Sequence, residues 1–152
     1  KTDPNGNIGA TGASLLENPG GSESHTGTAI YVGARLDMGS TKIGAEYNQG
    51  SKYWIGMIPD SDDIWTGKLG TRGSVYEVYL IQELKRKPIS KKGKAFVRLG
   101  YQYYDFQYSG SNNWVGAPVK IADMNLTNPA LQQLMAPLKN AQDLYATFDV
   151  QF

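Results

Sequence analysis

A chain of 152 residues is long enough for one domain or for part of a larger one. Its 15 basic and 14 acidic side chains leave a net charge of +1, which argues against a nucleic-acid binder that relies on a strong positive excess. The absence of cysteine and the single histidine exclude disulfides, thiolate chemistry and any site that needs two imidazoles. The sequence also shows no paired carboxylates at a defined separation, no nucleophile elbow and no redox motif, so we expect no enzyme activity, no cofactor and no metal.

Residues 1–26 are rich in glycine, asparagine, serine and proline, which predicts a loop or linker with no core of its own. Residues 27–152 follow a different pattern, in which apolar and polar side chains alternate as they do in strands with one apolar face. We expect five such strands, at about 27–38, 41–49, 73–84, from Lys94 to about 105, and 144–152.

The connections between these strands alternate in length. Those at 39–40 and 85–93 are short, whereas those at 50–72 and 106–141 are long. Up-and-down β-barrels of the bacterial outer membrane have short periplasmic turns and long external loops. The spacing therefore favours an all-β, antiparallel up-and-down transmembrane β-barrel, of which this chain supplies about five strands.

The last long connection contains one predicted short helix. Asn128 can cap it and Pro129 suits its first position, whereas Pro137 should kink or end it. Its apolar stripe should pack on the aromatic 50–72 connection as an external cap, with the inner barrel wall and a partner protein as the alternatives. The residues expected in this cap are Trp54, Trp65, Trp114, Leu131, Leu134 and Met135.

The final predicted strand has the length of a transmembrane strand and ends in an aromatic residue. Its apolar positions are Leu144, Ala146, Phe148, Val150 and Phe152. This ending resembles the last strand of bacterial outer-membrane β-barrels of the porin-like family. The resemblance implies that these residues are the signal read by the barrel-assembly machinery, in the outer membrane of a Gram-negative bacterium.

Charged side chains lie mid-strand on the face opposite the apolar one. Those expected to line a water-filled pore are Arg35, Glu46, Glu77, Arg98 and Asp149. In a soluble sheet the same residues would form the solvated face. The alternative fold is a secreted or surface β-sandwich that binds a partner through loops rich in tyrosine and tryptophan.

Five strands cannot close a transmembrane barrel, because single-chain bacterial barrels begin at about eight strands. We therefore expect a C-terminal part that is completed by N-terminal strands or by another subunit, with outer-membrane lipid as its surroundings. The expected function is passive passage of small solutes through a porin-like channel or barrel scaffold. No nucleic acid is expected among its partners.

Overall fold

Five long β-strands account for most of the residues that the structure describes. The computed structural model describes residues 24–56, 67–84, 93–112, 117–124 and 138–151. Within these ranges, two short 3-10 helices lie in the long connections. The elements are β1 (Ala29–Met38), β2 (Thr41–Gly50), η1 (Lys68–Gly70), β3 (Gly73–Glu83), β4 (Lys94–Phe106), η2 (Ile121–Asp123) and β5 (Asn140–Gln151).

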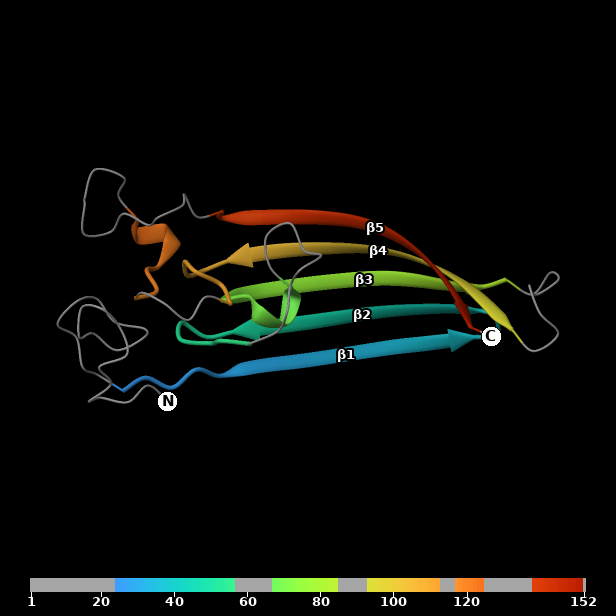
Figure 1. Cartoon of the computed structure of the whole chain (residues 1–152), viewed down its shortest axis with the longest axis horizontal. Helices are drawn as coiled ribbons and strands as arrows, with labels where there is room; N and C mark the ends of the chain where they lie inside the picture. Colours follow the sequence, from blue (N-terminus) through green and yellow to red (C-terminus); the bar gives the residue numbers. More distant parts are fainter. Residues whose placement is uncertain (1–23, 57–66, 85–92, 113–116, 125–137, 152) are drawn as a thin grey trace.

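The strands form one antiparallel up-and-down sheet in chain order, β1-β2-β3-β4-β5 (Figure 1). The β1–β2 turn lies at one end of the sheet, and the long connections after β2 and β4 leave from the other end. We call these the turn end and the loop end. The sheet is open, because β1 pairs only with β2, and β5 only with β4, among the described residues.

The alternation in the sequence placed the strands well. The start of β2, the starts of β3 and β4, and the end of β1 agree with expectation, and the other bounds differ by a few residues. The main difference is β5, which begins at Asn140 and not at Leu144 because Asn140 to Asp143 pair with the loop end of β4. The helix expected from Pro129 lies outside the described residues.

One face of the sheet is a continuous apolar surface, which we call the apolar face. Directly paired residues lie on the same side of a sheet, and one such row runs across all five strands as Leu36, Ile43, Leu80, Leu99 and Ala146. These side chains are open to the surroundings. Most large apolar side chains on this face are exposed, from 37% at Leu80 to 83% at Leu144, and a minority are half-buried: Tyr47, Val97, Tyr103 and Val150.

The opposite face, which we call the polar face, carries the buried residues at its loop end. Val75, Tyr104, Phe106 and Ala141 form a small core there, and Ile121 of η2 packs against it. The large apolar surface of the sheet is thus outside this core, the reverse of the usual arrangement in a water-soluble domain. Among the described residues, no helix has the length and apolar character needed to cross a bilayer.

Candidate functional site: a polar network centred on Glu77

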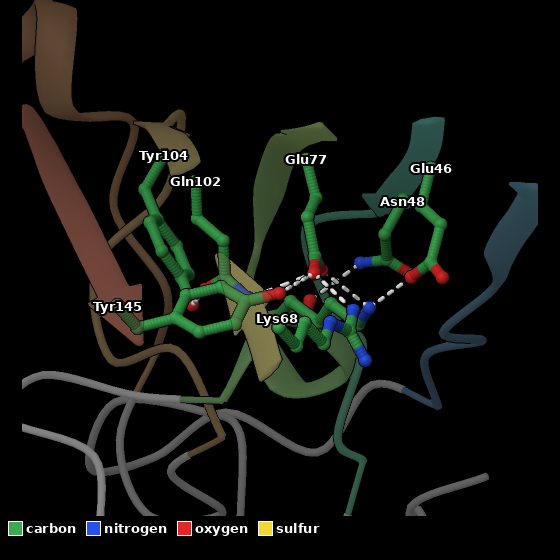
Figure 2. Close-up of polar contacts among 8 residues, drawn as sticks. Glu46, Asn48, Lys68, Glu77, Gln102, Tyr104 and Tyr145 are labelled. Carbon is green, nitrogen blue, oxygen red and sulfur yellow. Dashed lines mark hydrogen bonds and ion pairs between the residues drawn. The ribbon is translucent and has the colours of Figure 1, made fainter. Parts of the chain in front are cut away.

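Glu77, in the middle of β3, is the centre of the largest polar network on the polar face (Figure 2). Its side chain is only 1% exposed. The carboxylate accepts hydrogen bonds from Lys68 Nζ at 2.6 Å, Arg98 Nη2 at 2.6 Å and Gln102 Nε2 at 3.1 Å. The hydroxyl of Tyr145 also donates to it. A buried carboxylate with this many charged and polar donors is fully satisfied.

Lys68 joins the network from outside the sheet, because it belongs to η1 in the β2–β3 connection. Its ammonium also forms an ion pair with Glu46 of β2, so it contacts two carboxylates at once. Asn48 Nδ2 donates to the Lys68 carbonyl at 2.6 Å and fixes the backbone there. Burial lowers the pKa of Lys68, but the hydrogen bonds to Glu46 and Glu77 outweigh it and raise the pKa above 10.5.

Arg98 lies between two tyrosine rings on the polar face. Its guanidinium carbon is 4.1 Å from the ring centre of Tyr79 and 5.5 Å from that of Tyr145. A guanidinium close to aromatic rings is attracted by their negative faces. This attraction adds to the ion pair with Glu77 in holding the Arg98 side chain in place. The result is a strip of charged and aromatic side chains across β3, β4 and β5.

Two glycines make room for these rings. Gly44 is paired with Tyr79, and Gly100 is paired with both Tyr79 and Tyr145. A Cβ at position 44 would overlap the ring of Tyr79, and a Cβ at position 100 would overlap the ring of Tyr145. The aromatic side chains therefore lie flat on the polar face and cover glycine backbone, a known way to stabilise strands that contain glycine.

A second buried group, Arg72, joins the connections at the loop end. Its Nε donates to the Trp54 carbonyl at 2.9 Å and its Nη1 to the Ser109 carbonyl at 3.0 Å, while its backbone nitrogen donates to Ser111 Oγ at 2.9 Å. Burial lowers the pKa of Arg72 to about 10, so the guanidinium stays charged at neutral pH. Arg72 thus holds the residues after β2 and after β4 together.

The residues predicted to line a pore all lie on the polar face. Glu46, Glu77 and Arg98 belong to the network, with Lys68 as the link between the two carboxylates. Arg35 lies apart and pairs with Asp37 at 2.7 Å on the exposed strand β1. Asp149 lies toward the turn end, beside a groove of about 290 Å³ that Lys42, Phe96 and Arg98 also line.

The predicted assembly residues Leu144, Ala146, Phe148 and Val150 share the apolar face, whereas Phe152 lies outside the described residues. Of the predicted cap, only Trp54 is described. Its indole Nε1 donates to the Leu69 carbonyl at 2.7 Å, within the same connection. Trp65, Trp114, Leu131, Leu134 and Met135 lie outside the described residues.

Sequence reasoning missed Lys68, Arg72 and Gln102 as members of the site. The first two lie in connections, where no periodic pattern points to a face. Tyr145 and Gly100 were on the polar face by alternation, but their contact depends on strand register. Within the described ranges, no group of three or more histidine, aspartate or glutamate side chains is placed to hold a metal ion.

A family comparison covers the whole of the chain, residues 1–152, with the description "Protein of unknown function (DUF3373)". The chain belongs to the DUF3373 family. No curated protein and no solved structure matches it. Its function must therefore be argued from the two faces of the sheet and from the network itself.

Proposed function

We propose that this DUF3373 chain forms part of the wall of a porin-like β-barrel in the outer membrane of a Gram-negative bacterium. Small solutes pass through this barrel passively. The observation that carries the proposal is the unshielded apolar face, backed by a polar face with ion pairs around Glu77. In a barrel of this kind, lipid contacts the apolar face and water contacts the polar one.

The dimensions of the apolar face support this assignment. On β4 it extends from Ala95 to Tyr103, which at about 3.3 Å per residue corresponds to roughly 26 Å along the strand. Strands of outer-membrane barrels tilt by about 35–45°, so this length spans roughly 18–21 Å of an apolar band that is about 25 Å tall. The five strands of 10 to 13 residues have the length that such a crossing requires.

Tyrosines at the loop end add a second argument. Tyr47, Tyr76 and Tyr103 are direct neighbours on three adjacent strands, and their ring centres are 5.1 Å and 6.5 Å apart. Tyr101 lies one row deeper, opposite Val78. A row of tyrosines at one level is typical of the aromatic girdle at a membrane–water interface.

Strand directions define what must complete the barrel. Because the five strands alternate, β1 and β5 run in the same direction. An antiparallel barrel then needs an odd number of further strands between these two edges, and about three or more to reach the usual minimum of eight. Strands N-terminal to this sheet, or strands of another subunit, would meet that requirement.

The sandwich alternative requires a second layer over the apolar face. Among the described residues there is one sheet, and its apolar side chains are exposed. A partner-binding sandwich has less support than a barrel wall for this reason. The barrel proposal also assigns the barrel-assembly machinery and outer-membrane lipid as partners, through the apolar positions of β5.

Membrane fractionation and planar-bilayer recording of the full-length protein test the proposal. We expect the protein in the outer-membrane fraction, soluble only with detergent, and able to form steady ion-conducting channels. A protein that is soluble without detergent and adds no conductance to bilayers would contradict the proposed function.

A further inference from the structure

Two carboxylates face each other directly on the polar face. Glu46 of β2 and Glu77 of β3 are paired in register, so their side chains project from adjacent points of the sheet. Like charges at directly opposed positions repel and destabilise a sheet. Two such carboxylates on the wall of a water-filled passage would also attract cations.

The cation that contacts both carboxylates comes from a connection and not from a strand. Lys68 Nζ lies between the two carboxylates, 2.6 Å from Glu77 Oε2 and also paired with Glu46. The ring of Tyr31 flanks it, with its centre 5.7 Å from the ammonium nitrogen. The backbone of η1 is held by Asn48, as described above, so the ammonium has little freedom to leave.

We propose that Lys68 sets the charge preference of the passage by acting as the built-in counter-ion of the Glu46–Glu77 pair. This inference rests on the proposed channel function. Glu46 and Glu77 carry two negative charges, and Lys68 and Arg98 carry two positive charges, so the network is balanced. Removing the Lys68 charge alone therefore leaves one carboxylate uncompensated on the wall.

The size of the effect follows from the Coulomb energy of one unit charge. At about 6 Å in a water-like dielectric, one charge changes the local concentration of a monovalent ion by roughly threefold. A negative charge raises the local concentration of cations and lowers that of anions, so the ratio of the two concentrations changes by more than about threefold. Salt reduces the effect, so low ionic strength gives the clearest signal.

The test is the ratio of potassium to chloride permeability, from reversal potentials in a dilute KCl gradient. Lys68→Gln should raise this ratio by roughly threefold or more. Glu46→Gln leaves an excess positive charge and should lower the ratio by a similar factor. The double variant Lys68→Glu with Glu46→Lys keeps the total charge and should restore a ratio near that of the native protein.

Lys120→Gln is the matched control, because it removes the same charge from an exposed loop position beside η2. It should leave the ratio unchanged. Shifts of the permeability ratio in opposite directions for Lys68→Gln and Glu46→Gln, with the control unchanged, would support the proposal. If one of these two variants fails to assemble, the other suffices for the test. Normal channels with an unchanged ratio in Lys68→Gln and Glu46→Gln would overturn this inference alone, whereas absence of channels from the native protein would overturn the proposed function.

Discussion

The ring of Tyr145 lies directly over Gly100, in the space that a side chain at position 100 would occupy. The two residues are paired across β4 and β5, and the hydroxyl of the same ring donates to Glu77 two strands away from β5. Because Gly100 has no side chain, the Tyr145 ring can lie over β4 and place its hydroxyl within reach of Glu77. This contact links the packing of the wall to its polar network.

Replacing Gly100 with alanine should destabilise the sheet, because the new Cβ displaces the Tyr145 ring from Glu77. Forcing extra volume into a packed site typically costs about 1–3 kcal/mol. The measurement is the urea midpoint of unfolding in detergent. Gly33→Ala is the control, since its Cβ would come no closer than 3.2 Å to Glu46 Cγ and 3.3 Å to the Tyr31 hydroxyl and would overlap no ring. Equal stability of Gly100→Ala and the native protein would refute the packing argument.

Replacing Arg72 with lysine should loosen the loop end while leaving the strands paired. A lysine ammonium cannot reproduce the fork with which Arg72 reaches the carbonyls of Trp54 and Ser109. We expect faster limited proteolysis within 51–56 and 107–112, with the same strand content by circular dichroism. Arg35→Lys, at an exposed position on β1, should not change the cleavage rate. A cleavage pattern of Arg72→Lys identical to that of the native protein would show that the other loop-end contacts suffice.

Between pH 7 and pH 11, the attachment of η1 to the polar face should weaken only at the alkaline end. The folded-state pKa of Lys68 is raised above 10.5, so its contribution to stability is fully present below that value. The contribution is lost as the pH rises through the raised folded-state pKa. Proteolysis at 67–71, followed from pH 7 to pH 11, should accelerate only near the upper end. Lys68→Gln should be cleaved at the faster rate throughout, and acceleration of the native protein already at pH 8 would contradict this account.

Two neighbouring positions on β5 offer a matched test of which face meets lipid. Phe148 lies on the apolar face and Thr147 on the polar face, and both are exposed. Phe148→Asp should greatly reduce the amount of heat-modifiable protein in the outer membrane, because a charge facing lipid costs up to about 2–4 kcal/mol at mid-bilayer. Thr147→Asp should assemble normally. Equal assembly of the two variants would contradict the proposal that only the apolar face contacts lipid.

Much of the fold could be predicted from the sequence, because a strand with one apolar face has a period of two. The alternation of Val32, Ala34 and Leu36 was enough to place β1 and its apolar side. The pairing of Tyr145 with Gly100 could not be predicted, since the register of two paired strands depends on where both strands begin. The roles of Lys68 and Arg72 could not be predicted from the sequence either. A connection has no periodic pattern, and its contacts form only after the strands have positioned its two ends.

Spin labels distinguish the barrel wall from every soluble alternative. Single cysteines at Val32, Val78 and Leu99 report on the apolar face, and those at Arg35, Thr147 and Asp149 on the polar face. The lack of native cysteine removes background labelling. After reconstitution in liposomes, collision rates of each nitroxide with oxygen, which concentrates in lipid, and with a water-soluble nickel complex can be compared. We expect collisions with oxygen to dominate at the three apolar-face positions, and collisions with the nickel complex to dominate at the three polar-face positions. Low accessibility to both reagents at Val32, Val78 and Leu99 would mean that protein covers the apolar face, and would contradict the proposal that lipid does.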